Sequence, residues 1–526
     1  MMGHRTKQFK FFSPTNLEGL VPHDNFYRRL EERLDLSFVR DLVRDCYEEM
    51  GRPSVDPVVF FKLQLIGFFE GITSERRLME NAHLNLAHRW YLGYDLDEPL
   101  PDHSSLSKIR SRYGVEAFHR FFERIVELCM EAGLVDGEEL YFDATNVEAN
   151  ASMDSLRPRL SPVAAREHVR HVFADNPPPE GAVPPVASPP RDDKSGSVAE
   201  EAGHPPALKA SAPSVFGRLL ESYRHARRSP LRQRSAYVRT ADQYVSGTDP
   251  DARPMKTRGS RTKLGYHCQY VVDGGQARII LATLVTAATV MENSPMLDLS
   301  RWARFRWHLR PKQATGDMTY ATLENIKGLE DDGLKAYVPL PDWATKAGRY
   351  GPQAFTYLQE RDAYMCPQGQ ELPRAYTRPT ESVHVYQGRP KVCSVCPVKL
   401  DCTDSAKGRT IQRPFDQEYI ERVQRYHETE ACQRAIRKRK VWLEPLFAEA
   451  KTIHGLRRFR LRGLAKVNME GLMMAAGQNL KRLLRHHGAR PVPRPLALLA
   501  TLLLRLRRGL LPSFVPQGNC HLASAR

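Results

Sequence analysis

The first part of the chain, residues 1–135, carries apolar side chains at intervals that predict helices. Asp56, followed by proline, is typical of a helix N-cap with proline at the first helical position, and an apolar helix follows it. Gly71 interrupts that pattern, and Thr73 or Ser74 can cap the next helix. This segment is therefore predicted to be all-helical.

A third helix is predicted to begin after Asp102 and to include residues 106–113. It carries Lys108, Arg110 and Arg112. Short helices, a glycine turn and a basic last helix are typical of a helix-turn-helix arrangement, which predicts DNA binding. The alternative is a helical bundle whose basic face is only solvated.

From residue 140 the pattern changes to buried strands separated by helices. Strands are predicted at 140–145, 266–273, 278–286, 313–317 and 335–339, and helices at 295–304 and 323–331. The glycine pair at 274–275 predicts a hairpin between the second and third strands. The order predicts a mixed α/β domain interrupted by insertions.

Composition divides the rest of the chain. Residues 174–213 are rich in Pro, Ala and Ser and are predicted to be a disordered insertion. The predicted domains are a helical region at 1–135, the first part of an α/β domain at 136–341, a Cys-rich insertion at 342–414, the C-terminal part of the α/β domain at 415–490, and an Arg/Leu-rich tail at 491–526.

Charge points to an anionic partner. Lys and Arg number 78 against 61 Asp and Glu, a formal net charge of +17, which favours nucleic acid. The longest apolar run, 496–504, is too short for a membrane helix, and the N-terminus has no apolar signal region. Nine scattered cysteines do not resemble a secreted disulfide framework. We therefore expect a cytoplasmic, nucleoid-associated protein with no membrane partner.

Two carboxylates are the strongest catalytic candidates. Asp143 and Asp317 each come at the end of a predicted strand, where functional groups gather in α/β sheets. Carboxylates from neighbouring strands can hold Mg²⁺ or Mn²⁺, and two such ions ~3.5–4 Å apart serve phosphodiester chemistry. The alternative is that both aspartates only cap turns.

A third carboxylate, Glu444, lies in a basic helical region. Arg437, Lys440 and Lys451 fall on the same helical face as Glu444, which suits a metal ligand whose neighbours bind phosphates. Pro445 disfavours the α conformation at Glu444, so a kink is expected there. The alternative is an exposed face with ordinary ion pairs.

Four cysteines fall close together, with spacings C-x₂₆-C-x₂-C-x₅-C. Four thiolates in a reduced compartment predict a tetrahedral structural zinc with no open position for chemistry. The predicted ligands are Cys366, Cys393, Cys396 and Cys402. The alternative is unliganded thiols in a loop.

Basic residues dominate the region around Glu444. The DNA-binding candidates are Arg437, Lys440, Lys451, Arg457 and Arg458, with further Lys and Arg up to Arg485. Aromatic side chains are sparse there, which favours contact with the phosphate backbone over base stacking.

These motifs together resemble bacterial insertion-sequence transposases of the DDE type, and the resemblance extends over nearly the whole chain. Residues 55–112 resemble the N-terminal helical transposase domain. FDATNVEANAS resembles the first-aspartate motif and ATGDMTY the second, led by Asp143 and Asp317. LEPLFAEAKTIHGLRRFRLRG resembles the glutamate region, with Glu444 in the third role.

The resemblance implies an RNase H-like catalytic domain preceded by a helical DNA-binding domain and interrupted by the small Cys-rich insertion. Related transposases carry a Tyr-x₂-Arg-x₃-Glu-x₆-Lys signature around the glutamate. Here Glu444 and Lys451 match it, Lys440 stands where Arg is expected, and Arg437 stands where Tyr is expected. Lysine keeps the charge but loses the bidentate fork. Glu449 and Glu470 rank below Glu444 as the third ligand.

The implied reaction is hydrolysis at an element end, which frees a 3′-hydroxyl, followed by attack of that hydroxyl on target DNA. Asp143, Asp317 and Glu444 would hold two Mg²⁺ or Mn²⁺ ions. The implied partners are terminal inverted repeats, target DNA and further copies of the chain, as a homodimer or higher multimer. The alternatives are an inactive, domesticated transposase that only binds DNA, and a metal-dependent nuclease that cuts without joining.

Overall fold

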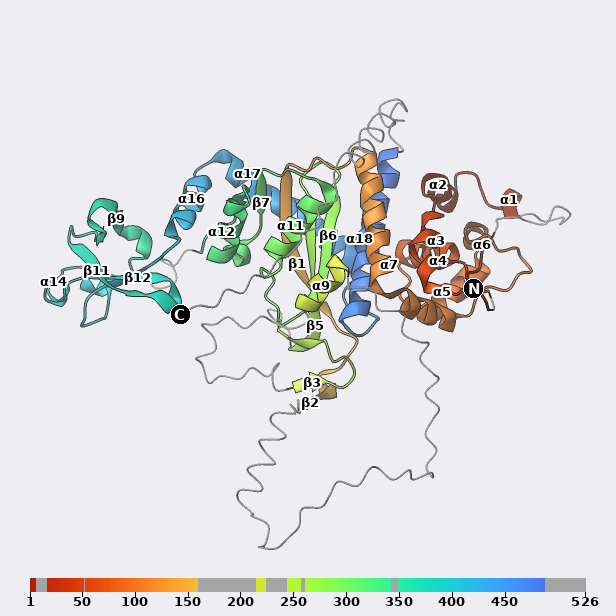
Figure 1. The fold of residues 1–526 in the computed structure, drawn as a ribbon, viewed down its shortest axis with the longest axis horizontal. Helices are drawn as coiled ribbons and strands as arrows, with labels where there is room; N and C mark the ends of the chain where they lie inside the picture. Colours follow the sequence, from red (N-terminus) through yellow and green to blue (C-terminus); the bar gives the residue numbers. More distant parts are fainter. Residues whose placement is uncertain are drawn as a thin grey trace, which may run out of the picture.

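The computed structural model describes residues 1–5, 17–51, 53–158, 214–223, 244–256, 261–341 and 349–487. Both the predicted disordered insertion at 174–213 and the Arg/Leu-rich tail at 491–526 lie outside these residues. Figure 1 shows helices at one end of the molecule, a sheet with helices at its centre, and the Cys-rich segment at the other end.

The N-terminal region is helical, as its sequence pattern predicts. Its helices are α1 (Leu17–Leu20), α2 (Phe26–Arg33), α3 (Phe38–Leu42), α4 (Pro57–Phe69), α5 (Glu75–Leu84), α6 (Leu86–Leu92) and α7 (His103–Glu131). Asp56, Ser74 and Asp102 cap α4, α5 and α7 by accepting hydrogen bonds from backbone amides. Because these caps satisfy amides that the first helical turn leaves unpaired, they define where each helix begins.

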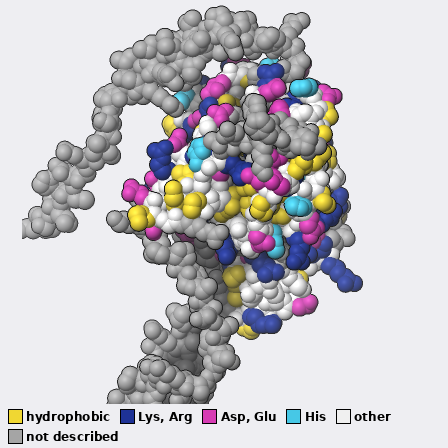
Figure 2. Space-filling model, turned by 90° about the vertical axis from the view of Figure 1, so that its right-hand side faces the viewer, with side chains coloured by type: hydrophobic (Ala, Val, Ile, Leu, Met, Phe, Trp, Pro, Cys, Tyr) yellow, Lys and Arg dark blue, Asp and Glu magenta, His cyan; other side chains and the backbone are white. Residues whose placement is uncertain are grey.

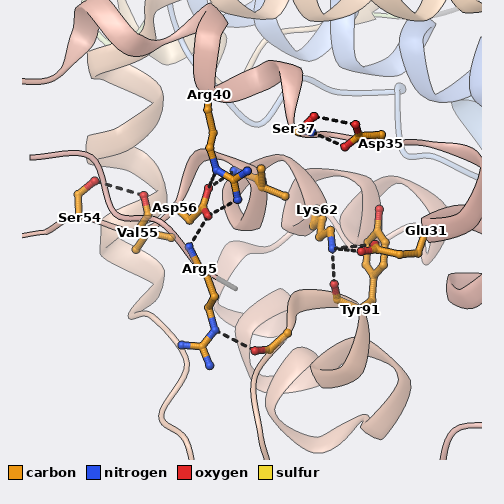
Figure 3. A network of polar contacts seen from close by, with 12 residues as sticks. Arg5, Glu31, Asp35, Ser37, Arg40, Ser54, Val55, Asp56, Lys62 and Tyr91 are labelled. Atoms are coloured by element: carbon orange, nitrogen blue, oxygen red, sulfur yellow. Dashed lines mark hydrogen bonds and ion pairs between the residues drawn. The ribbon is translucent and has the colours of Figure 1, made fainter. Parts of the chain in front are cut away.

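Asp56 is more than a cap, because its buried carboxylate also binds two arginines (Figure 3). Arg40 donates to both carboxylate oxygens, at 3.2 and 2.7 Å, and the backbone amide of Arg5 donates at 2.7 Å. Nearby, the Nζ of Lys62 donates to Glu31 and to the carbonyl of Tyr91. These bonds fix α4 against the helices around it.

Helix α7 is longer than predicted and changes direction at Gly114, whose φ of 66° lies in the left-handed region. One residue of its expected basic face points inward. Arg110 is buried and forms an ion pair with Glu75 of α5, so it is not available to DNA. Lys108 and Arg112 remain exposed.

The centre of the molecule is a six-stranded mixed sheet in the order β4-β5-β1-β7-β8, with β6 also paired to β5. The strands are β1 (Glu139–Glu148), β4 (Arg253–Met255), β5 (Lys263–Asp273), β6 (Ile280–Ala287), β7 (Gln313–Thr315) and β8 (Lys335–Tyr337). Two helices in the same region are α11 (Met296–Trp307) and α12 (Leu323–Asp331). The predicted mixed α/β order is confirmed.

Three further elements lie outside this sheet. Strands β2 (Leu156–Pro158) and β3 (Tyr244–Ser246) pair with each other, and α9 (Val215–Ser222) packs against α7. The ring of Phe216 on α9 stacks on His119 of α7, with ring centroids 4.1 Å apart.

Three C-terminal helices complete the domain: α16 (Gln417–His427), α17 (Glu430–Thr452) and α18 (Leu464–His487). α18 covers the edge strand β6. Asn468 bonds both the amide and the carbonyl of Val285, and Asn479 does the same for Ile280. The two asparagines thus satisfy backbone groups that a free strand edge would expose.

The same helix joins the sheet to the N-terminal helices. α7 packs along α18, and Gly477 of α18 lies so close to Phe68 of α4 that a Cβ there would come within 2.6 Å of the ring. His454 stacks on the same ring, with centroids 3.9 Å apart. One continuous apolar core therefore runs from α1 to α18.

The Cys-rich segment forms a separate five-stranded antiparallel sheet in the order β13-β12-β11-β10-β9. Its strands are β9 (Thr356–Leu358), β10 (Ala363–Met365), β11 (Glu371–Arg378), β12 (Val383–Gln387) and β13 (Thr410–Pro414), with short helices α14 (Pro390–Ser394) and α15 (Lys399–Cys402). It has a small core of its own around Tyr364, Leu372 and Tyr386.

Candidate active site and nucleic-acid interface

Asp143 and Asp317 are brought together by parallel strand pairing. β1 pairs with β7 in the register Tyr141↔Thr315, and each aspartate lies two residues beyond its member of that pair. The two strands therefore bring the two carboxylates to the same level of the sheet. The two carboxylates also interact electrostatically, because the charge of Asp317 raises the pKa of Asp143. Asp143 itself lies inside β1, not at its end as predicted, because β1 continues against β5 to Glu148.

The Asp143 side chain is only 16% exposed. Burial raises its pKa to about 6, against the opposing charge of Arg439. Arg439 on α17 donates to Oδ2 at 2.9 Å, and the amide of Ala144 donates to Oδ1 at 2.9 Å. A cationic group thus already neutralises the carboxylate that the sequence assigns to a metal.

Asp317 caps a turn as well as facing Asp143. Its Oδ1 accepts from the amide of Thr319 at 2.7 Å, at the start of a short 3₁₀ helix. The turn-capping role that the sequence left open is therefore present, and it occupies one carboxylate oxygen of Asp317.

A third carboxylate near this pair, Glu292, was missed by the sequence analysis. It lies in the loop after β6, next to Asn293, whose side-chain amide donates to the carbonyl of Thr319 at 2.7 Å. That bond ties the loop to the turn that carries Asp317. Burial raises the pKa of Glu292 to about 7, and the charges of Asp317 and Asp143 add to the effect. Its place just after a strand of the same sheet was the available signal.

Glu444 lies on α17 and is exposed. The helix continues through Pro445, so the expected kink does not form a break. The inward face of this stretch carries Leu443, Leu446 and Phe447, while Arg439 reaches Asp143. Within the parts of the chain that the structure describes, no side-chain bond joins Glu444 to the aspartates, and no three His, Cys, Asp or Glu side chains are grouped to hold a metal.

The two weaker candidates for the third ligand are used elsewhere. Glu449 accepts from Lys481 at 2.6 Å and Arg482 at 3.2 Å. Glu470 accepts from the amide and the guanidinium of Arg460, at 2.9 and 2.6 Å. Both carboxylates therefore fasten the C-terminal helices and loops, which leaves Glu444 and Glu292 as the remaining candidates for the third ligand.

Most predicted DNA-binding residues lie at the surface. Arg437, Lys440, Arg457 and Arg458 are exposed, whereas Lys451 is half-buried, and burial lowers its pKa. The backbone at Arg457 and Arg458 pairs with Glu148, at the end of β1. Basic side chains are thus placed at the end of the strand that carries Asp143.

At the other candidate interface, the N-terminal helices, charges are mixed. Figure 2 faces this end of the molecule and shows basic, acidic and apolar side chains interspersed. The prediction that these helices contact DNA stays a prediction.

The four predicted cysteine ligands line one cavity of about 420 Å³, but among the described residues their sulfurs are not grouped as a metal site. The Sγ of Cys366 accepts from the amide of Gln370 at 3.3 Å, and burial raises the pKa of Cys402 against the charge of Arg409. A Cβ at Gly388 would come within 2.8 Å of the Sγ of Cys393. Glycine at position 388 therefore allows the backbone to lie close to the Cys393 thiol.

Comparison with known proteins identifies two domains. Residues 15–112 match the family Transposase domain (DUF772), and residues 365–484 match the family Transposase DDE domain. The second match includes Glu444 and the four cysteines, while Asp143 and Asp317 lie between the two matches. No curated protein and no solved structure matches the chain.

A DDE domain implies an RNase H-like fold, the use of divalent metal ions and DNA as partner, in agreement with the mixed sheet and the acidic pair. No helix among the residues that the structure describes is long and apolar enough to span a membrane. The chain therefore carries two domains of transposase families, a DUF772 transposase domain near its N-terminus and a transposase DDE domain in its C-terminal part.

Proposed function

We propose that this chain is a transposase that binds the ends of an insertion sequence and catalyses metal-dependent DNA cleavage and strand transfer. The observation that carries the proposal is the parallel register of β1 and β7, which sets Asp143 beside Asp317. Burial and the nearby charge of Asp317 both raise the pKa of Asp143, and a divalent cation shared by the two carboxylates would offset this cost.

The donor set fits Mg²⁺ or Mn²⁺, because it consists of carboxylate oxygens. The ion pair of Arg439 with Asp143 shows that this site stabilises positive charge. Bound ions would activate the attacking oxygen and stabilise the leaving oxygen of the phosphodiester. Arg439, when displaced from Asp143, is placed to bind a DNA phosphate, and Arg437, Lys440, Lys451, Arg457 and Arg458 extend this basic surface.

The test is cleavage of supercoiled plasmid that carries the DNA flanking the gene, with Mg²⁺, Mn²⁺ or EDTA. Wild type is expected to cut at a defined end with either metal and not with EDTA. Asp143→Asn is expected to reduce cutting more than about 100-fold, since loss of a direct ligand should exceed the loss seen for an outer-shell partner. Asp154→Asn, at a turn outside the acidic pair, is the control and should cut normally.

Two outcomes would contradict the proposal. Tight binding of the flanking DNA by wild type without cleavage would indicate a domesticated DNA-binding protein, and would direct attention to Arg437 and Lys440. Cleavage without joining of the 3′-hydroxyl to a second duplex would indicate a nuclease.

The third ligand is proposed to be Glu444, with Glu292 as its competitor. Glu444 and Arg439 lie on the same helix, α17. A shift of this helix could therefore release Arg439 from Asp143 and bring Glu444 toward the aspartates. In the same assay, Glu444→Gln should lose cleavage as Asp143→Asn does, and Glu292→Gln should retain part of it. The reverse order would assign the ligand to Glu292.

We also propose that Cys366, Cys393, Cys396 and Cys402 bind a structural zinc. Support comes from their shared cavity, the hydrogen bond that the backbone amide of Gln370 donates to the Cys366 sulfur, and the two glycines, Gly388 and Gly408, that leave room for the Cys393 sulfur. Because four thiolates complete a tetrahedral site, this zinc would stabilise the segment and take no part in catalysis.

The proposed partners are element terminal repeats and target DNA, bound by a homodimer or higher multimer on paired ends. The basic surface beside Asp143 supports DNA as the partner.

A further inference from the structure

A second basic site lies at the opposite end of β1 from the basic residues at Glu148. It is a cleft of about 630 Å³. Its walls are the turn between α7 and β1, the hairpin between β5 and β6, and the last turns of α18. Its charged lining residues are Asp136, Arg278, Arg482, Arg485 and His486.

Three guanidinium groups converge in this cleft. Arg482 is 16% exposed and donates to Glu449 at 3.2 Å and to the carbonyl of Gln478 at 2.6 Å. Burial lowers the pKa of Arg482, and the charges of Arg278 and Arg485 lower it further, so the three cations lie close enough to repel one another. Among the described residues, neither Arg278 nor Arg485 has a carboxylate partner. Uncompensated positive charge held together in this way favours an anionic ligand.

The backbone at Arg278 adds an independent observation. Its φ is 55°, in the left-handed region where glycine or asparagine is normally found. The guanidinium of Arg278 lies over the ring of Trp442 on α17, 4.5 Å from the ring centroid. A bulky residue in a strained turn, with its charge oriented by an aromatic ring, is typical of a functional position.

The cleft is connected to the acidic pair by further cations on α17. Lys438 lies on the same Trp442 ring, 4.8 Å from its centroid, and binds Glu139 at the start of β1. The next residue, Arg439, reaches Asp143. Glu139 and Asp143 are four residues apart on β1, or about 13 Å along an extended strand. Measured along the helix axis of B-DNA, where one strand has a phosphate about every 3.4 Å, that length corresponds to about four phosphates.

We propose that the cleft formed by Arg278, Arg482 and Arg485 binds the phosphate backbone of DNA a few nucleotides from the phosphate held at Asp143 and Asp317. The inference rests on the proposed function, because it assumes that DNA is bound at the acidic pair. One carboxylate, Asp136, also lines the cleft. Its negative charge repels a bound phosphate, so its removal should strengthen DNA binding, whereas removal of an arginine should weaken it.

The experiment measures affinity of the full chain for a duplex that carries one end of the gene's flanking DNA, by fluorescence anisotropy at several salt concentrations. Arg278→Gly removes the guanidinium and relieves the backbone strain, and Arg485→Ala removes an exposed charge. The double variant should bind at least about 10-fold more weakly at low salt, and its salt slope should fall by nearly two units, since each lost phosphate contact removes about 0.9. Asp136→Asn should bind more tightly.

Arg301→Ala is the matched control, because this exposed arginine of α11 is already paired with Asp332. It should leave affinity and slope unchanged. Wild-type affinity and slope in the double variant would overturn the inference. If wild type cleaves in the plasmid assay while that result is obtained, the cleft inference fails and the proposed function stands. If the double variant weakens binding while wild type does not cleave, the cleft inference stands and the proposed function fails.

Discussion

At the scale of single residues, two carboxylates show how environment decides role. Asp143 is buried beside one arginine and one aspartate, and burial raises its pKa to about 6. Burial also acts to raise the pKa of Glu449, but His454, Lys481 and Arg482 outweigh it and lower the pKa below its ordinary value. Asp143 is therefore suited to exchange its partner for a metal ion, whereas Glu449 stays ionised to a lower pH than an ordinary glutamate and holds α17 to α18.

Replacement of Glu449 by Gln should destabilise the protein at pH 7 by about 3 kcal/mol, because two partly buried cations, Lys481 and Arg482, lose their partner. A carboxylate whose pKa is lowered on folding stabilises the protein fully above its ordinary pKa of 4.5, and this contribution decreases progressively as the pH falls from that value toward the lowered pKa. Urea unfolding at pH 7 and at pH 4 measures the change. The difference between wild type and variant should shrink at the lower pH.

Exposed Glu428, in a matched Glu428→Gln variant, should unfold as wild type does at both pH values. A loss in Glu449→Gln of the same size at pH 4 and pH 7 would mean that Glu449 contributes through packing and not through its charge.

At the scale of elements, the Cys-rich sheet differs from the central sheet. Its core contains few buried apolar side chains, among them Phe355, Tyr364 and Leu372, and its cysteines face a cavity. Small modules with little apolar core commonly depend on a metal for stability. The cavity between β10, α14 and α15 is where such an ion would join these elements.

Purified protein should therefore contain about one zinc per chain, measured by elemental analysis, as four thiolates complete one tetrahedral site. Cys393→Ser should lose most of it, and Gly388→Ala should weaken binding because its Cβ would press on the Cys393 sulfur. Cys46→Ser, remote from the cavity, is the control and should keep its zinc. An unchanged zinc content in Cys393→Ser would refute the site.

At the scale of the whole molecule, the N-terminal helices and the central sheet share one core. Phe68 of α4 packs on Gly477 of α18, and α7 packs along the same helix. The boundary predicted at residue 135 separates two sequence patterns, but the apolar core continues across it. The N-terminal helices thus support the fold whether or not they bind DNA.

Deletion of residues 1–135 should consequently prevent folding, because it uncovers the apolar side of α18. Circular dichroism and size-exclusion chromatography should show loss of cooperative unfolding and aggregation. Excision of residues 342–414, whose sheet has its own core, is the comparison and should leave a soluble protein.

A soluble, cooperatively folding truncation would contradict the shared-core interpretation. Base recognition by the N-terminal helices is better tested by Lys108→Ala and Arg112→Ala, whose side chains are exposed.

Local sequence determined much of the secondary structure. Asp56, Ser74 and Asp102 cap helices where their side chains predict it, and α12 has the predicted limits. Caps and periodic apolar positions depend on neighbours within a few residues, so they are visible in the sequence. For the same reason the strands that carry or precede Asp143 and Asp317 were predictable, although the full length of β1 was not.

Only the tertiary structure decided which distant residues meet. It placed Glu292 beside the aspartates, Arg439 on Asp143, and Arg110 in an ion pair inside the N-terminal region. These contacts depend on strand register and helix packing between segments tens to hundreds of residues apart, and a carboxylate or guanidinium looks the same in the sequence whichever partner it finds. The sequence by itself determined the elements and the chemical groups, and long-range packing determined which of those groups share a site.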